Sequence, residues 1–224
     1  MAITVILFDL DETLLRTGGA GVLAMNRAFQ ELFGIPQALD GIPYAGRLDP
    51  QIVADALAHH GIQGDREAIM AAFKERYLHH LQQTLWEREG HVMPGIPQLL
   101  AALREQAEVE VGLATGNFRQ AAWLKLQRYG LEGFFREGAF GEDAWERAQL
   151  VALAARRVAG PRRWRRVLVV GDTPLDVAAA LARGFVPVGV ATGRYGEAEL
   201  RAAGAHITFP HLGDWQQALE ALLS

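Results

Sequence analysis

The sequence contains no cysteine, which excludes disulfide bonds, cysteine-ligated zinc and a thiolate nucleophile. Its one serine is Ser224, the last residue, so an internal Ser-His-Asp triad is also excluded. Neither of the two lysines, Lys74 and Lys125, follows a G-x-x-x-x-G stretch, so there is no P-loop for nucleotide phosphates. Any chemistry must therefore rest on carboxylates, threonines, histidines and arginines.

Long hydrophobic runs and excess positive charge are missing as well. The apolar run Ile3–Phe8 is interrupted at once by Asp9 and Asp11, so it is neither a signal peptide nor a membrane span. The formal net charge of −4 gives no electrostatic reason to expect nucleic-acid binding. We expect a cytoplasmic protein, a monomer or homodimer, whose partner is neither a membrane nor a nucleic acid.

The chain alternates between short apolar runs and segments with helical periodicity. This order predicts an α/β fold with a Rossmann-like parallel sheet covered by helices. The predicted strands are 4–8, 109–114, 167–170, 186–190 and 206–209. The predicted helices are 96–104, 119–129, 144–158, 175–183 and 215–223.

The stretch 17–90 breaks this alternation. Its apolar residues recur at helical spacing and no strand is expected in it. We therefore predict an all-helical cap domain over 17–90, inserted into a catalytic core made of 1–16 and 91–224. Glycine or proline lies at both crossings between the two parts, which is typical of hinges.

Polar side chains follow three of the predicted strands. Asp9 and Asp11 follow the first strand, Thr115–Asn117 follows the second, and Asp172 and Asp176 follow the third. Because ligands bind at the carboxyl ends of strands in open parallel sheets, we expect these groups to meet at one edge. Taken singly, an aspartate at a strand end is as often a turn or helix-cap residue, and Asp172 is followed by a Thr-Pro pair suited to a helix start.

Four aspartates at one edge repel one another unless a cation lies between them. An oxygen-only cluster with no histidine or cysteine nearby in sequence suits Mg²⁺, and Mg²⁺ is typical of phosphate chemistry. A carboxylate can attack phosphorus to give an aspartyl-phosphate, and a second carboxylate two residues later can protonate the leaving alcohol. The pattern thus indicates a Mg²⁺-dependent enzyme acting on phosphate esters.

The motifs resemble those of the haloacid dehalogenase-like hydrolases. Phe8-Asp-Leu-Asp-Glu-Thr-Leu14 is similar to the first motif of that family, Thr115-Gly-Asn117 to the second and Gly171-Asp-Thr-Pro-Leu-Asp176 to the fourth. The segment before Pro94 sits where that family carries a helical cap. The resemblance covers nearly the whole chain and is greatest to the phosphoglycolate-phosphatase-type branch.

This resemblance implies roles for individual residues. Asp9 would be the nucleophile and a Mg²⁺ ligand, and Asp11 the acid/base, which coordinates through its backbone carbonyl. Asp172 would be a further metal ligand, and Asp176 a ligand through water or a support behind it. Thr115, with the amides of Gly116 and Asn117, would hold the transferring phosphoryl group.

The third motif departs from the family pattern, which usually places a lysine roughly two dozen residues before the aspartate of the fourth. This interval contains no lysine, but Arg147 stands 25 positions before Asp172. We predict that Arg147 binds phosphate there, although arginine and lysine are not interchangeable. The alternatives are that Arg147 is an exposed helix residue, or that Lys125 reaches in from the helix after Asn117.

Within the predicted cap, Arg47 is the residue that resembles a substrate contact. It lies in Tyr44-Ala-Gly-Arg-Leu-Asp49, a stretch similar to a Gly-Arg-Thr-Asp segment of related caps, with leucine in place of threonine. Arg47 is expected to meet a substrate anion when the cap closes, or else to be a solvated loop residue.

Four functions fit these residues. The first is a phosphatase for a small phosphorylated metabolite, working through an aspartyl-phosphate. The second is a phosphomutase of the same fold. A 2-haloacid dehalogenase fits less well, since halide leaves without a proton and has no use for Asp11. A non-catalytic binding protein is disfavoured because the acidic residues that the chemistry needs are all present.

Overall fold

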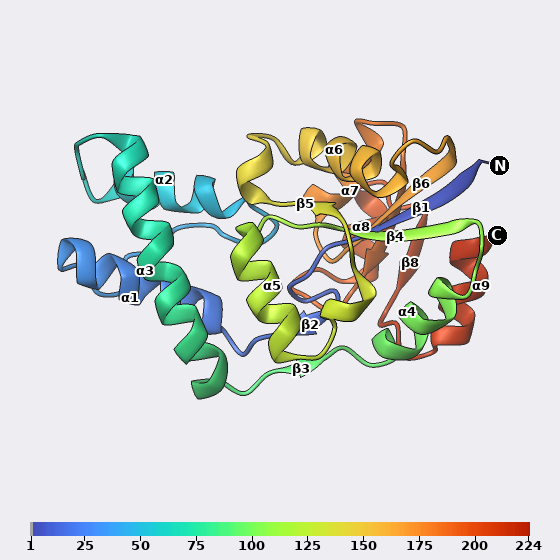
Figure 1. The fold of residues 1–224 in the computed structure, drawn as a ribbon, viewed down its shortest axis with the longest axis horizontal. Coiled ribbons are helices and arrows are strands. Elements are labelled where there is room, and N and C mark those ends of the chain that lie inside the picture. Colours follow the sequence, from blue (N-terminus) through green and yellow to red (C-terminus); the bar gives the residue numbers. More distant parts are fainter. Residues whose placement is uncertain (1) are drawn as a thin grey trace.

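The computed structural model describes residues 2–224, and its centre is a six-stranded parallel sheet (Figure 1). The strand order is β5-β4-β1-β6-β7-β8. The strands are β1 (Ile3–Phe8), β4 (Val109–Ala114), β5 (Gly138–Ala139), β6 (Trp164–Gly171), β7 (Val186–Val190) and β8 (Ile207–Phe209). The predicted α/β class and parallel sheet are confirmed.

Register aligns the ends of the three central strands. Phe8 of β1 lies opposite Leu113 of β4 on one side and Val170 of β6 on the other. The polar residues that follow each of these strands therefore emerge at one edge of the sheet. Backbone pairing thus brings together segments more than one hundred residues apart in sequence.

Helices cover both faces of the sheet because β1 is apolar on both sides. Ile6 and Phe8 pack into one core with α4 (Ile96–Arg104) and α9 (Trp215–Leu223), while Val5 and Leu7 pack into another on the opposite face. That second core contains α6 (Arg147–Ala159) and residues of α7 (Pro174–Leu181). Alternate residues of β1 thus pack into two different cores, and all six residues of the strand are buried.

Residues 17–90 contain three helices, drawn on the left of Figure 1: α1 (Ala20–Phe33), α2 (Asp49–His59) and α3 (Arg66–Glu87). They enclose an apolar core of their own, to which α5 (Arg119–Arg128) adds Ala121. A short antiparallel pair, β2 (Leu15–Arg16) with β3 (His91–Val92), joins the two crossings. The expected domain boundaries stay a prediction.

Most predicted elements are present, with shifted ends. The helices α4 and α9 have the predicted bounds, and β6 begins three residues earlier than expected because Arg166 and Trp164 pair with β1. The elements that were not predicted are β2, β3, β5, α8 (Glu197–Ala202) and two 3₁₀ turns at Glu132–Phe134 and Gly141–Asp143. Each is six residues or shorter, too short to leave a periodic pattern. Across residues 2–224, every helix is too short or too polar to cross a membrane.

Candidate active site

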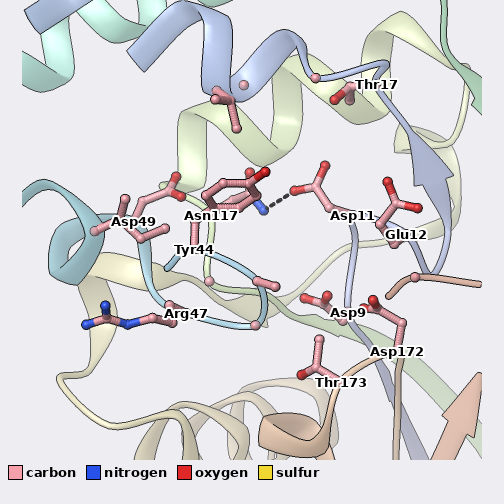
Figure 2. Close-up of a pocket in the computed structure, with 18 of the residues that line it drawn as sticks. Asp9, Asp11, Glu12, Thr17, Tyr44, Arg47, Asp49, Asn117, Asp172 and Thr173 are labelled. Atoms are coloured by element: carbon pink, nitrogen blue, oxygen red, sulfur yellow. Dashed lines mark hydrogen bonds between the residues drawn. The ribbon is translucent and has the colours of Figure 1, made fainter. Parts of the chain in front are cut away.

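A cavity of about 380 Å³ opens where the central strands end (Figure 2). Its walls come from the strand ends of the sheet on one side and from α1 and the loop before α2 on the other. Of the residues predicted from sequence, seven line it: Asp9, Asp11, Arg47, Gly116, Asn117, Arg147 and Asp172. The two others, Thr115 and Asp176, lie directly behind this lining and are buried.

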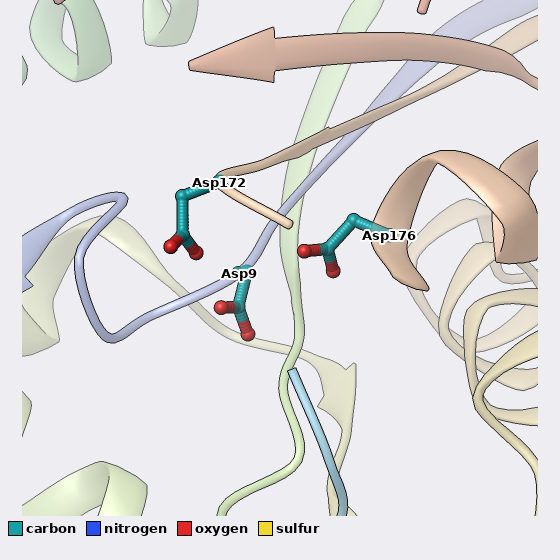
Figure 3. Close-up of side chains that lie close together, drawn as sticks. All are labelled: Asp9, Asp172 and Asp176. Atoms are coloured by element: carbon teal, nitrogen blue, oxygen red, sulfur yellow. The ribbon is translucent and has the colours of Figure 1, made fainter. Parts of the chain in front are cut away.

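Three carboxylates converge beside the cavity, Asp9 and Asp172 in its lining and Asp176 behind them (Figure 3). Asp9, Asp172 and Asp176 each offer an oxygen atom, and these oxygens lie within 4.8 Å of one another. All three side chains are buried. Hard oxygen donors gathered at this spacing match the ligand set of a divalent cation such as Mg²⁺.

Burial makes negative charge costly in this cluster. The pKa of Asp9 is raised to about 7, mainly by burial; Arg147 lowers it, while Asp176 and Asp11 contribute to raising it. Burial likewise raises the pKa of Asp172 to about 9, helped by Asp176 and Asp9 and opposed by Arg147. The single positive charge of Arg147 therefore does not balance three carboxylates, and a bound divalent cation would supply the additional positive charge.

Arg147 reaches the carboxylates from the first turn of α6. Its Nη2 lies 2.9 Å from Asp9 Oδ1 and 2.6 Å from Asp176 Oδ1, and its Nε donates a hydrogen bond of 2.8 Å to the same Asp176 oxygen. Its Nη1 donates to the carbonyl of Gly46 at 3.0 Å. Burial alone lowers the pKa of this guanidinium, but Asp176 and Asp9 raise it above its usual value. Arg147 is thus not an exposed helix residue.

The start of α6 explains how Arg147 comes to lie there. The sequence predicts this helix from Ala144, but the 3₁₀ turn at Gly141–Asp143 precedes it and Ala144 is extended. The Asp143 carboxylate accepts the backbone N–H of Phe140, which stabilises that turn. Because the helix begins at Arg147 instead, this side chain projects from the helix end that faces the strand ends.

Asp176 has a structural task as well. It forms a capping box at the start of α7: the Thr173 N–H donates to Asp176 Oδ2 at 3.1 Å, and the Asp176 N–H donates back to Thr173 Oγ1 at 3.3 Å. The Thr173 hydroxyl also donates to Asp176 Oδ2 at 2.7 Å. Helix capping and a place in the acidic cluster are therefore compatible for this motif. The Oδ1 atom, on the other side of the carboxylate, contacts Arg147.

Asp11 lies apart from the three-carboxylate cluster, as Figure 2 shows. Its Oδ2 accepts hydrogen bonds from Asn117 Nδ2 at 2.8 Å and from Lys125 Nζ at 2.6 Å. Lys125 also donates to Asn117 Oδ1 at 2.6 Å and is buried. Both cations that the sequence offered for the third motif thus lie in the site, Arg147 beside Asp9 and Lys125 beside Asp11.

The turn after β4 is built around Thr115. Its Oγ1 accepts the Nδ2 of Asn117 at 2.9 Å and the backbone N–H of Asn117 at 3.3 Å, which fixes the tight turn. Gly116 has no room for a side chain, because a Cβ there would lie 2.1 Å from the carbonyl oxygen of Arg47. Glycine is therefore required where the loop before α2 contacts this turn.

That loop is fastened to the core by its backbone and by Asp49. The Asp49 N–H donates to the Gly116 carbonyl at 2.7 Å, and the Asp49 carboxylate accepts the Phe118 N–H at 2.8 Å. Burial raises the pKa of Asp49 to about 7, against the lowering by Lys125 and by the Phe118 N–H. The Arg47 side chain pairs instead with Asp55 at 2.5 Å and points away from Asp9 and Asp172 in Figure 2. Its role toward a substrate stays a prediction.

Other residues of the cavity lining were not selected from the sequence, among them Arg16, Tyr44, Asp49 and Arg194. Arg194 follows β7, so the rule applied to the first three strand ends would also have indicated it. Arg16 lies in the short strand β2, Tyr44 in a loop and Asp49 at the first residue of α2, and no periodic pattern marks these positions.

Comparison with known proteins agrees with the fold and the motifs. The family model of the haloacid dehalogenase-like hydrolases matches residues 3–194, and the chain belongs to that family. The chain is 29% identical, over 98% of its length and 99% of the relative's, to a phosphoglycolate phosphatase of Cereibacter sphaeroides.

Solved structures show the same fold. A hydrolase from Pseudomonas syringae has a TM-score of 0.74 at 21% identity, with 98% of each chain covered. CbbY from Rhodobacter sphaeroides, solved in complex with phosphate, has a TM-score of 0.69 at 22% identity, with 95% of this chain and 96% of that chain covered. The resemblance inferred from the motifs is thereby confirmed at the level of the family.

Proposed function

We propose that this protein is a Mg²⁺-dependent phosphatase that hydrolyses a small phosphorylated metabolite through an aspartyl-phosphate on Asp9. The observation that carries the proposal is the convergence of Asp9, Asp172 and Asp176 beside a separately held Asp11. Asp9 lies beside two other carboxylates that could bind a cation, whereas Asp11 lies beside two hydrogen-bond donors, Asn117 and Lys125. These two environments suit a nucleophile and an acid/base respectively.

The residues divide the chemistry as follows. Asp9 attacks phosphorus while Asp11 protonates the leaving alcohol; Asp11 then takes a proton from the water that hydrolyses the aspartyl-phosphate. A Mg²⁺ ion held by Asp9, Asp172, Asp176 and the Asp11 carbonyl would neutralise phosphate charge and keep Asp9 ionised. Arg147 adds a fixed positive charge beside the attacking oxygen. The amides of Gly116 and Asn117 and the Thr115 hydroxyl are proposed to hold the phosphoryl oxygens.

Residues 17–90 are proposed to act as a cap over this site, with the core made of 1–16 and 91–224. Support comes from the separate apolar core of α1–α3 and from the loop before α2, which contacts the site through Gly46 and Asp49. A cap excludes water and selects the substrate by its shape and charge. We further propose a cytoplasmic location, in keeping with a small phosphorylated metabolite as substrate.

The substrate class is supported by the size of the cavity and by the relative from Cereibacter sphaeroides, whose name is phosphoglycolate phosphatase. Phosphoglycolate is therefore the first ester to assay. Phosphate release should require Mg²⁺, stop in EDTA, and fall at least 10³-fold in Asp9→Asn, since an amide cannot attack phosphorus. Activity that persists without metal or without Asp9 contradicts the mechanism. Transfer of phosphate to a sugar phosphate rather than to water would indicate the phosphomutase instead.

A further inference from the structure

Five cationic side chains line the cavity, and four of them are paired with carboxylates. These four pair with carboxylates as follows: Arg16 with Glu12, Arg47 with Asp55, Lys125 with Asp11, and Arg147 with Asp9 and Asp176. Arg194 is the fifth, and it forms no ion pair with the described part of the chain. Its charge is therefore the one that an anionic ligand can meet without displacing a carboxylate.

Arg194 is held in place by a neutral partner. Its Nη2 donates to the hydroxyl of Tyr44 at 2.8 Å, and its guanidinium carbon lies 5.0 Å from the centre of the Tyr44 ring. A phenol and an aromatic face orient a guanidinium without neutralising it. The guanidinium has five N–H donors in all, so the N–H groups that do not bind Tyr44 stay available for a carboxylate or phosphate.

The loop that carries Arg194 is fixed against the catalytic residues. The Thr192 hydroxyl donates to the Glu12 carbonyl, and the Thr192 carbonyl accepts from Arg16 Nη2 at 2.8 Å. Gly193 contacts Asp172 so closely that a Cβ would lie 1.8 Å from Asp172 Oδ2. Arg194 is the next residue along the chain; it is exposed and lines the same cavity as Asp9 and Asp172.

We propose that Arg194 is a specificity-determining residue that binds a second anionic group of the substrate, while the phosphoryl group lies at Asp9. The substrate class is then a small phosphate ester with a carboxylate or second phosphate a few bonds from the phosphoryl group. The inference rests on the proposed function for the position of the phosphoryl group. It adds a reason for selecting esters that carry a second anionic group over esters with a neutral tail.

The experiment measures binding, so that it does not depend on turnover. Asp9→Asn and the double variant Asp9→Asn/Arg194→Gln are titrated calorimetrically, with Mg²⁺ present, with three esters: 2-phosphoglycolate, ethylene glycol bisphosphate and ethyl phosphate. Loss of one charge-assisted contact should weaken binding of the anionic esters about tenfold, and that of ethyl phosphate less than about twofold. The two anionic esters distinguish a carboxylate from a phosphate as the second group.

Two further variants separate recognition from a merely structural role. Arg194→Lys keeps the charge and should restore part of the discrimination, and Arg201→Gln, an exposed arginine paired with Glu197, should leave all three affinities unchanged. An equal loss for all three esters, no loss for any, or no binding of any ester overturns the proposal. Failure of the proposed function is a different result: the unmodified protein then releases no phosphate, whatever the binding ratio.

Discussion

Replacing Arg147 by alanine should destabilise the protein strongly when no metal is present. The guanidinium contacts Asp9, Asp176 and the Gly46 carbonyl, and its side chain is only 9% exposed. Removing one partner of a buried ion pair typically costs about 3–5 kcal/mol, because the remaining charge is left uncompensated. Protonation of Asp9, whose pKa is already raised, offsets part of this, so we expect a loss of about 3 kcal/mol.

The loss of stability in Arg147→Ala should depend on whether a divalent cation is present. A divalent cation bound to the same carboxylates supplies positive charge that the variant lacks, so Mg²⁺ should stabilise Arg147→Ala more than the unmodified protein. The assay is urea unfolding at pH 7, once in EDTA and once in Mg²⁺, with Arg162→Ala as a control. Arg162 pairs with Glu110 at the surface, and its removal should change stability by less than about 1 kcal/mol.

Two outcomes would refute this reasoning. A loss below about 1 kcal/mol of unfolding free energy in EDTA would mean that Arg147 does not compensate the charge of the carboxylates, because breaking a buried ion pair should destabilise the protein by more than this. An equal loss in EDTA and in Mg²⁺ would mean that no cation binds beside it. Phosphatase activity of Arg147→Ala, measured at saturating Mg²⁺, should still be at least 10²-fold reduced, because a charge beside the transferring phosphoryl group is gone.

Three other predictions concern the surroundings of the cluster. Lys125→Met should lower kcat about 10–100-fold in a phosphate-release assay with little change in KM, because the Lys125 ammonium positions Asp11, the proposed acid/base. An unchanged kcat would contradict that role. Gly116→Ala places a Cβ 2.1 Å from the Arg47 carbonyl oxygen and should cost about 1–3 kcal/mol in urea unfolding. Gly133→Ala, whose Cβ would have no atom of residues 2–224 within 4 Å, should cost less than about 1 kcal/mol, and equal effects would count against the close contact. Burial raises the pKa of Asp49 from 3.8 to about 7, so the folded protein keeps this proton between these pH values and its stability falls as the pH rises. Relative to Asp49→Asn, the unmodified protein should lose about 2 kcal/mol of unfolding free energy between pH 5 and 7. Parallel stability curves for the two proteins would show that the pKa of this carboxylate is not raised.

The long periodic elements of the fold could be predicted from local patterns. A continuous apolar run such as β1 is stable when it is buried on both faces, and the amphipathic stretches α4 and α9 carry start signals, Pro97 in the first turn of α4 and Asp214 at the N-cap of α9. The short pieces could not be predicted. The strand β5 is two residues long and exists because Leu113 and Ala114 of β4 offer unpaired backbone groups beside it.

The sequence by itself determined the family, the parallel sheet and the three strand ends that carry the acidic residues, because residue type and strand order follow from the chain alone. It left open which cation lies beside Asp9. Only the tertiary structure decided that: a 3₁₀ turn delays the start of α6 to Arg147, while Lys125 approaches Asp11 from another helix. It also decided that Arg194 has no carboxylate partner among residues 2–224, since pairing depends on distances between segments that no local pattern records.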